Sequence, residues 1–285
     1  MRVIVLGSTG YLGSRVIKEL ISRNHQVLCL IRTNSNMQNL SDILDRVDTC
    51  LVEDLPQKLE QMEEKYDVFF NAACRYARAD THDAEIFEAN MNVPLKTFLT
   101  CVQHGVNRHI TVGTGLPDEF NVYTVSKHEF ATLGKWYCNR LAMNNRNIQF
   151  LNIELENYYG KDEPKERFLP STIEKLKRDE PIMLTEGTQK RDFVYIDDVS
   201  SILVKLIEQY PTPGYVNIPL GTGEGVAVRD VIKYLKEITN SKSELCFGAV
   251  PKRLYEPDSI ADCTVLQELG LYAQYDWKTG MKFLI

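Results

Sequence analysis

The sequence predicts an α/β fold, a Rossmann-type doubly wound parallel sheet followed by a smaller C-terminal α/β region. Three features of the chain support this prediction. A glycine-rich turn follows the first apolar run, apolar runs and helical patterns then alternate as far as Asn157, and the chain becomes more polar after Tyr159. Short strands that alternate with helices are typical of βαβ units, whose strands are parallel.

The first apolar run, Val3–Leu6, is predicted to be a buried strand that ends at a glycine-rich turn. Leu12, Val16 and Leu20 then recur at helical spacing, so the turn lies between a strand and a helix. In this context glycine lets the backbone approach a pyrophosphate, and the helix N-terminus supplies free N–H groups. The alternative is a glycine-rich turn of purely structural use. We expect the whole G-x-x-G-x-x-G segment to bind a dinucleotide: Gly7, Ser8, Thr9, Gly10, Tyr11, Leu12 and Gly13.

The second strand, Gln26–Ile31, ends without the acidic residue that would bind the ribose hydroxyls of NAD. Arg32 follows it, and a guanidinium can accept the extra phosphate of NADP. We therefore predict NADP (NADPH) over NAD, the alternative being that Arg32 is a solvated loop residue. A third strand over 48–52 leads to Asp54 and Leu55, which we assign to the cofactor site. Asp54 would meet the adenine amino group or cap the next turn.

Later strand ends bring small and polar residues to the same edge of the predicted sheet. The fourth strand, 68–70, is followed by Asn71, Ala72 and Ala73, whose small size suits close approach by a ligand. A fifth strand over 110–112 leads to Thr114, and a sixth covers 147–154. Helices are predicted over 57–66, 83–104 and 124–144, and Pro94 should kink or restart the second of them.

Tyr123 and Lys127 are four residues apart, and Thr114 precedes Tyr123 by nine. On a helix this spacing places the phenol and the ammonium on one face. The reference pKa of tyrosine is about 10; lowering it to about 7 requires about 4 kcal/mol, which a close cation can supply. The pattern Y-x-x-x-K is common by chance and gains weight only with a redox cofactor site before it. We predict Tyr123, Lys127 and Thr114 as catalytic residues, with the Thr114 hydroxyl holding a carbonyl oxygen beside the phenol.

The change of character after Tyr159 predicts a domain boundary. We expect residues 1–157 to form the dinucleotide-binding domain, with 190–218 returning to it, and residues 158–189 and 219–285 to form a substrate-binding region. The elements expected beyond the boundary are a helix over 171–178 capped by Ser or Thr, a strand within 189–196, a helix over 199–208 capped by Asp197, a strand over 215–218 and a helix over 228–238.

Five ordered motifs together resemble the extended short-chain dehydrogenase/reductase family, the NAD-dependent epimerase/dehydratase family, along the whole chain. They are Gly7–Gly13, Asn71-Ala72-Ala73, Thr114, Tyr123-x-x-x-Lys127 and the segment from Arg191 to Val199, which reads RDFVYIDDV. Members act mostly on nucleotide-activated sugars. Segments 72–78, 113–117 and 154–160 are similar to bacterial CDP-abequose and CDP-paratose synthases, which reduce C4 of a CDP-4-keto-3,6-dideoxyhexose with NADPH.

The resemblance implies roles for the predicted catalytic residues. Tyr123 would donate a proton to the developing C4 alkoxide. Lys127 would lower the pKa of Tyr123 and bind the nicotinamide ribose, and Thr114 would hydrogen-bond the substrate oxygen. The nicotinamide would supply the hydride, and the protein would supply the placement.

The resemblance also implies substrate contacts in the second half of the chain. Arg191 matches the family arginine that grips the nucleotide diphosphate, a task that suits a forked guanidinium; the alternative is an ion pair with Asp192 or a neighbour. Arg253 would be a second diphosphate contact. Asn157 would touch the sugar or the nicotinamide side. Asn90, which we place with the cofactor-binding residues, would support the catalytic loop.

Two other activities of the family, and one binding function, are the alternatives. Sugar 4,6-dehydratases carry an Asp-Glu pair directly after the catalytic threonine, whereas Asp118-Glu119 comes later here. A 4-epimerase retains tightly bound NAD, and Arg32 favours exchangeable NADPH and net reduction instead. A non-catalytic dinucleotide sensor usually loses the tyrosine and lysine that this chain keeps. The predicted function is therefore an NADPH-dependent 4-ketoreductase of a nucleoside-diphosphate deoxysugar.

Composition limits the partners and the compartment. The chain has 285 residues and a net charge of −6, which disfavours a nucleic-acid partner. Its seven cysteines form no C-x-x-C and are expected to be free thiols in the cytoplasm. There is no signal-peptide pattern and no apolar run near the ~18 residues of a membrane span. The five histidines show no metal-binding spacing, so no metal is proposed. A homodimer is expected by analogy with the family.

Overall fold

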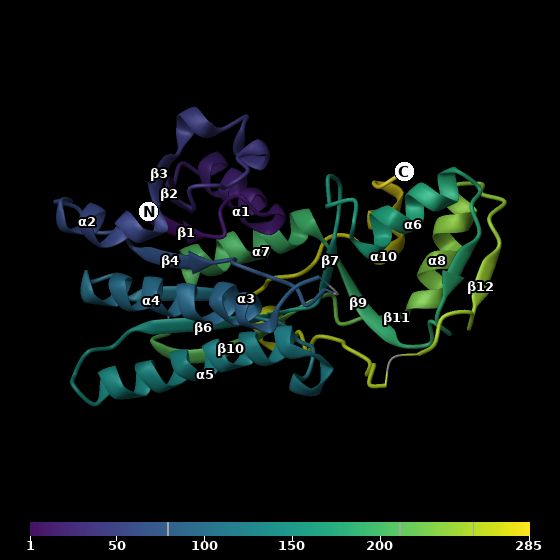
Figure 1. The fold of residues 1–285 in the computed structure, drawn as a ribbon. Coiled ribbons are helices and arrows are strands. Elements are labelled where there is room, and N and C mark those ends of the chain that lie inside the picture. Colours follow the sequence, from purple (N-terminus) through teal and green to yellow (C-terminus); the bar gives the residue numbers. More distant parts are fainter. Residues whose placement is uncertain (79, 211, 253) are drawn as a thin grey trace. The chain divides into compact units, whose positions relative to one another are not determined.

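The computed structural model describes residues 1–78, 80–210, 212–252 and 254–285. The chain forms two compact units (Figure 1). The first comprises Met1–Glu154 and Ser200–Ile218, and the second comprises Leu155–Val199 and Pro219–Ile285.

The first unit is built on a seven-stranded sheet, as the alternating pattern predicts. The strand order is β10-β6-β5-β4-β1-β2-β3, and the pairs from β6 to β3 in that order are parallel. The chain starts at β1 inside the sheet, adds β2 and β3 on one side, and then adds β4, β5 and β6 on the other side, which is the doubly wound arrangement. In such sheets, ligand sites lie at the carboxyl ends of the strands. The strands are β1 (Arg2–Leu6), β2 (Gln26–Ile31), β3 (Asp48–Leu51), β4 (Val68–Asn71), β5 (Arg108–Val112), β6 (Gln149–Leu155) and β10 (Gly214–Leu220).

Helices cover both faces of this sheet. Buried side chains of β1, β2, β4 and β6 pack in one cluster with side chains of α2 (Leu55–Glu60), α4 (Val93–Gln103) and α5 (Val122–Ala142). On the other face, α1 (Tyr11–Ser22) lies by α7 (Ile196–Gln209), where Arg23 pairs with Glu208 at 3.0 Å. Figure 1 shows α4 and α7 on opposite sides of β4.

The helix expected over 83–104 is divided into three segments. These are α3 (Asp83–Phe87), a π-helical segment (Glu88–Asn92) and α4. Pro94 lies in the first turn of α4. The backbone stays helical at Asn92 and Val93, so the position of Pro94 marks a change from π-helical to α-helical hydrogen bonding and not a new helix start.

His109 on β5 is a fully buried histidine in the aromatic part of the core. Its ring lies edge-on to Phe98, with centroids 4.7 Å apart, and to Phe69 at 6.2 Å. Burial lowers the pKa of His109 to about 3, so the imidazole is neutral in the folded protein. In the unfolded chain its pKa returns to about 6.5. Below that pH the imidazole is protonated in the unfolded chain while it stays neutral in the folded chain. The free energy of unfolding therefore decreases as the pH falls.

We expect His109→Phe to remove this pH dependence. Relative to the variant, the wild type should lose about 1.4 kcal/mol of unfolding free energy for each pH unit between about 6 and 3. Urea unfolding of both proteins over a pH series measures the difference, and the subtraction cancels the groups that they share. A difference that does not change with pH would contradict this account.

The second unit contains smaller sheets and the remaining helices. Its three-stranded sheet has the order β11-β9-β7, and β12 pairs with β8. The strands are β7 (Asn157–Tyr159), β8 (Ile182–Leu184), β9 (Lys190–Tyr195), β11 (Gly225–Ala227) and β12 (Leu245–Phe247), and the helices are α6 (Phe168–Lys177), α8 (Val228–Ile238), α9 (Thr264–Glu268) and α10 (Trp277–Lys282).

Two expectations for this part of the chain are wrong. Residues 190–199 belong to the second unit, because β9 forms its ladders with β7 and β11; the return to the first unit begins at Ser200. Helix α6 begins at Phe168, and its N-cap residue Arg167 makes no side-chain cap hydrogen bond, so the predicted Ser or Thr cap does not exist. Pro170 fits the first turn of the longer helix.

Asp192 on β9 is a fully buried carboxylate that organises the second unit. Its oxygens accept from the backbone N–H and hydroxyl of Thr222 at 2.9 and 2.6 Å. They also accept from the N–H groups of Gly223 (2.8 Å) and Ala261 (3.3 Å). A Cβ at Gly221 would lie 2.2 Å from Oδ2, so glycine is needed for this close approach. The charge is thus stabilised by a ring of neutral donors.

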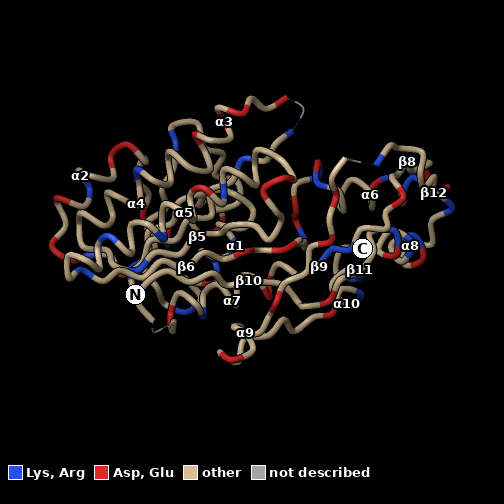
Figure 2. Tube along the Cα trace, turned by 90° about the horizontal axis from the view of Figure 1, so that it is seen from below, with Lys and Arg blue, Asp and Glu red and all other residues tan. Residues whose placement is uncertain are grey.

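Charged residues are distributed along the whole length of the described chain. Acidic and basic residues are interspersed in both units (Figure 2). The net charge of −6 is therefore not gathered in one segment. Among the helices of the described residues, none has both the length and the hydropathy that crossing a membrane would require.

Candidate active site

The glycine-rich loop after β1 is packed so tightly that side chains are excluded at two positions. Gly7 has a φ of +79°, and a Cβ there would lie 2.5 Å from the backbone N of Ala73. A Cβ at Gly13 would lie 2.2 Å from the carbonyl oxygen of Gly7. The Ser8 hydroxyl donates to the carbonyl of Leu30 at 2.8 Å, which fixes the loop against β2.

The rest of the loop leads directly into a helix. The N–H of Gly10 donates to the carbonyl of Gly7 at 3.1 Å, and the Thr9 carbonyl accepts from Asn39 at 2.9 Å. Tyr11 and Leu12 begin α1 and are buried. A close-packed glycine loop that opens a helix fits a pyrophosphate, because its backbone N–H groups and the helix N-terminus attract anions.

Gly13→Ala tests this fit. The added methyl group must displace the Gly7 carbonyl, so we expect the dissociation constant for the dinucleotide to rise at least tenfold, about 1.4 kcal/mol. Calorimetric titration of the full chain with NADPH and NADH measures it. Gly270→Ala is the control outside the loop: alanine is strained at its φ of +68°, but a Cβ there meets no atom within 4 Å, so the dinucleotide affinity should not change. Unchanged dinucleotide affinity in Gly13→Ala would contradict the assignment.

The segment after β4 lies against the glycine loop. Asn71 pairs in register with Leu6 of β1 and Thr111 of β5, so the three strands end at one edge. Its amide nitrogen donates to Thr111 Oγ1 at 2.9 Å, and its amide oxygen accepts from Ala73 N at 3.0 Å. Ala72 N donates to the Leu6 carbonyl at 2.9 Å. The side chain of Asn71 thus shapes this strand end.

Lys127 on α5 is buried at the same edge. Its Nζ donates to the carbonyl oxygens of Ala73 (2.7 Å) and Val112 (2.9 Å), which follow β4 and end β5. Burial lowers the pKa of Lys127, and the charge of Cys74 opposes that decrease. Two acceptors leave one of the three ammonium hydrogens for a further partner. Lys127 therefore connects α5 to the segment that contacts the glycine loop.

Tyr123 lies in the first turn of α5, close to where the sequence predicts the helix to begin. Asn121 caps the helix: its side chain accepts from Thr124 N at 3.2 Å, and the Thr124 hydroxyl accepts in turn from Asn121 N. The Ser126 hydroxyl donates to the Tyr123 carbonyl at 2.7 Å. The ring of Tyr123 is buried and packs on Tyr76, with centroids 5.1 Å apart.

Thr114 is buried in the loop between β5 and α5. Its hydroxyl oxygen accepts from Leu116 N at 3.3 Å, and its backbone carbonyl lies 3.2 Å from Nε2 of His128. The other ring nitrogen of His128 contacts the carboxylate of Asp118. The loop that carries Thr114 is thus held to α5 by two side chains that the sequence interpretation does not include.

Asn90 is fully buried in the π-helical segment and contacts α5. Its amide pairs with both backbone groups of Arg75, at 2.7 and 2.9 Å, and donates to Ser126 at 3.0 Å. These bonds connect the segment after β4 to α5. They suit the supporting role predicted for Asn90 better than direct contact with a cofactor.

The adenine end of the predicted cofactor site lies beside β2 and β3. A cavity of about 460 Å³ there has Ile31, Leu51 and Asp54 in its lining. Asp54 is at the N-cap of α2 but makes no side-chain cap hydrogen bond, whereas the side chain of Leu55 is buried in the core. Arg32 is exposed directly after β2.

Of the substrate contacts predicted in the second half of the chain, Arg191 and Asn157 lie in the second unit. The Arg191 guanidinium is buried, donates to the carbonyls of Lys190 (2.9 Å) and Pro257, and lies 3.7 Å from the carboxylate of Glu256. The ion pair considered as an alternative thus exists with Glu256 and not with the adjacent aspartate. Asn157 is the first residue of β7. Arg253 lies outside the described residues.

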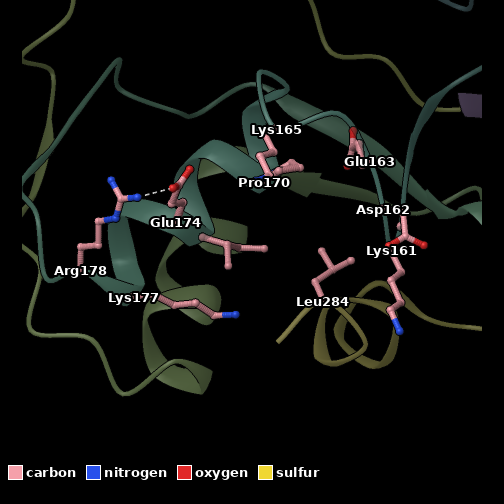
Figure 3. A pocket seen from close by; sticks show the side chains of 11 residues that line it. Lys161, Asp162, Glu163, Lys165, Pro170, Glu174, Lys177, Arg178 and Leu284 are labelled. Carbon is pink, nitrogen blue, oxygen red and sulfur yellow. Dashed lines mark hydrogen bonds and ion pairs between the residues drawn. The ribbon is translucent and has the colours of Figure 1, made fainter. Parts of the chain in front are cut away.

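The second unit also contains a cavity of about 360 Å³ (Figure 3). Lys161, Lys177 and Arg178 lie in its lining, and Arg178 pairs with Glu174. Glu163 in the same lining is buried, and burial raises the pKa of its carboxyl to about 7. None of the predicted site residues lines this cavity.

The first unit places the Lys127 ammonium at the strand end beside the glycine loop, with Tyr123 one turn earlier on α5 and Thr114 in the loop that follows β5. That set suits proton transfer to a carbonyl oxygen together with hydride transfer from a nicotinamide. The residues that sequence reasoning missed are Tyr76, Asp118, Ser126 and His128. Of these, His128 could have been considered from the sequence, because it is a titratable residue that directly follows Lys127.

Comparisons with known proteins agree with this geometry. The family model for the "NAD dependent epimerase/dehydratase family" matches residues 3–218. A CDP-abequose synthase of Salmonella muenchen is 26% identical over 296 residues, which cover 100% of this chain and 97% of that protein.

Solved structures with the same fold include two UDP-glucose 4-epimerases. The enzyme of Thermotoga maritima, with UDP-glucose, has a TM-score of 0.84 at 21% identity, covering 99% of this chain and 97% of that chain. The enzyme of Thermus thermophilus, in complex with NAD, has a TM-score of 0.80 at 18% identity, with the same coverage. At these identities the likeness establishes the fold, including both units.

Proposed function

Because this chain belongs to the NAD dependent epimerase/dehydratase family, we propose that it is an NADPH-dependent reductase of the C4 ketone of a nucleoside-diphosphate deoxysugar. The observation that carries the proposal is the position of Lys127. Its ammonium is fixed by the carbonyls of Ala73 and Val112, and Ala73 also packs against Gly7. One contact path therefore connects the catalytic helix to the dinucleotide loop.

The residues of the first unit have distinct tasks in this reduction. The nicotinamide, when bound, supplies the hydride. Tyr123 donates its phenolic proton to the C4 oxygen as negative charge develops there. Lys127 stabilises the phenolate and uses its remaining hydrogen for the ribose. The Thr114 hydroxyl, whose oxygen already accepts from Leu116, donates its hydrogen to the substrate oxygen.

Arg191 and the full-length relative support the proposed substrate class. Arg191 would bind the diphosphate, to which a forked guanidinium is suited, by exchanging its contact with the Glu256 carboxylate for phosphate oxygens. The likeness to a CDP-abequose synthase favours a CDP-4-keto-3,6-dideoxyhexose. Exposed Arg32, in place of an acid after β2, favours NADPH.

A 4-epimerase that retains NAD is the second candidate. It is favoured by the structural likeness to two UDP-glucose 4-epimerases. The two functions differ in cofactor balance, because a reductase consumes one reduced cofactor for each product and an epimerase consumes none.

A substrate panel tests the proposal. The purified chain is incubated with NADPH or NADH and with CDP-, dTDP-, UDP- or GDP-linked 4-keto-6-deoxy sugars, with and without the 3-deoxy group. We expect loss of the reduced-nicotinamide absorbance, fastest with NADPH and the CDP-linked 3,6-dideoxy sugar. If NADPH binds but no sugar in the panel is reduced, the proposal is wrong.

A further inference from the structure

The Arg191 guanidinium in the second unit is almost completely covered by other parts of the chain. Its side chain is 9% exposed. Nη1 donates to the carbonyl oxygens of Lys190, at 2.9 Å, and Pro257, and Nη2 lies 3.7 Å from the Glu256 carboxylate. A phosphate group can therefore bind the guanidinium only by displacing a group that covers it. The carboxylate is the group to displace, because it is an anion, as phosphate is.

The segment that carries Glu256 is fixed to β9 by its backbone and by Asp258. Ser259 N donates to the Lys190 carbonyl at 3.1 Å, and the Ser259 carbonyl accepts from Asp192 N at 3.0 Å. The Asp258 carboxylate accepts from Lys190 N at 2.7 Å. None of these three bonds uses the side chain of Glu256, so the carboxylate can turn away from the guanidinium while the segment remains paired with β9.

The carboxylate of Glu256 is buried with few of the hydrogen bonds that it could accept. Oε1 accepts from the side-chain amide of Gln189 at 3.1 Å, and Oε2 is buried without a hydrogen-bond partner among the described residues. An ionised carboxylate can accept about four hydrogen bonds. The 3.7 Å contact with Arg191 is longer than the ~2.9 Å of a charge-assisted hydrogen bond. Such a contact offsets only part of the desolvation cost of the two charges, so Glu256 is a weak partner for Arg191.

We propose that Glu256 is an internal competitor for the diphosphate, and that it sets the affinity of the second unit for nucleoside diphosphates. The inference rests on the part of the proposed function that assigns the diphosphate to Arg191. A diphosphate carries more negative charge than a carboxylate and offers several acceptors to the forked guanidinium, so it displaces Glu256. The displaced charge then remains near the bound phosphates and repels them. Glu256 thus lowers the affinity for substrate and product alike.

Calorimetric titration of the full chain with CDP and with inorganic pyrophosphate tests the competition. Saturating NADPH is present, so that pyrophosphate does not bind the dinucleotide loop. Glu256→Gln should lower both dissociation constants about tenfold, because the competing charge is lost while the new amide oxygen can still accept from Gln189. Glu244→Gln removes the same charge at an exposed position before β12 and should leave both constants unchanged.

Arg191→Gln tests whether the guanidinium is the group for which the two anions compete. CDP is the probe here, because its base and ribose add contacts that pyrophosphate lacks. Arg191→Gln should raise the dissociation constant of CDP. In that background Glu256→Gln should change the constant by less than about twofold, since residues that act on one another have non-additive effects. A change as large as that in the wild-type background would show that Glu256 acts without Arg191 and would overturn the inference.

Glu256→Ala is the second variant, because it removes the carboxylate with a side chain of different size. It should also bind pyrophosphate more tightly than wild type, whereas a purely structural role of Glu256 predicts weaker binding. Unchanged or weaker pyrophosphate binding in either variant, once circular dichroism shows that variant to be folded, overturns the competition. This result does not depend on the reaction catalysed. Tighter binding in a chain that reduces no sugar of the panel refutes the proposed reduction and leaves the competition standing.

Discussion

Tyr123→Phe should lower kcat by about 1000-fold or more while the chain still binds its dinucleotide. Phenylalanine keeps the ring that packs on Tyr76, and the cap formed by Asn121 and Thr124 holds the backbone in either case. The change therefore removes the phenolic hydroxyl and little else. Without that hydroxyl, the proton donor of the proposed reduction is lost.

Single-turnover rates and calorimetric cofactor titration separate the two effects. Tyr137→Phe is the matched control, because Tyr137 lies on the same helix and packs its ring on Phe98 and Trp136. That variant should keep the wild-type rate. Equal rates for Tyr123→Phe and wild type would show that the phenol is not the proton donor.

Asp192→Asn should destabilise the second unit by about 2–5 kcal/mol. Asparagine replaces one acceptor oxygen by a donor group. Because the backbone N–H groups of Thr222, Gly223 and Ala261 and the Thr222 hydroxyl all point at this side chain, donors would face donors. The closed packing at Gly221 leaves little room for the side chain to move away.

The effect can be assigned to the second unit by fluorescence. Trp277 lies in the second unit and Trp136 in the first, so urea unfolding in a Trp136→Phe background reports on the second unit. Glu237→Gln, at an exposed position of α8, is the control and should change the unfolding free energy by less than about 0.5 kcal/mol. Equal stability of Asp192→Asn and its parent would contradict the role of the buried carboxylate.

Local patterns were sufficient to predict the first unit, because its strands are apolar runs separated by helical repeats. The change of helical hydrogen bonding near Pro94 agrees with an irregularity expected from the chemistry of proline. The second unit was harder. Its strands β7, β8, β11 and β12 have only three residues each, too few for a periodic signal. Residues 190–199 were assigned to the wrong unit because local periodicity does not show which distant segments pair with a strand.

The candidate site, like the fold, could be predicted only in part. Gly7–Gly13, Tyr123 and Lys127 follow spacing rules that a single sequence displays. The two carbonyl oxygens that hold Lys127 have no sequence signal, since every residue has a carbonyl group. The contact of Arg191 with Glu256 spans 65 residues of sequence, and the bond between His128 and the Thr114 carbonyl depends on how a loop folds back. Such contacts appear only when the chain is packed.

The most direct test of the central claim uses NADPH that carries deuterium at the hydride that is transferred. The product from a CDP-4-keto-3,6-dideoxyhexose is examined by NMR, and the oxidised cofactor is counted. A reductase places one deuterium on C4 of each sugar and forms one NADP for each product. If the ketone is recovered without deuterium and no cofactor is oxidised, while C4 of a nucleotide sugar that carries a 4-hydroxyl group is inverted, the account is wrong and the enzyme is an epimerase.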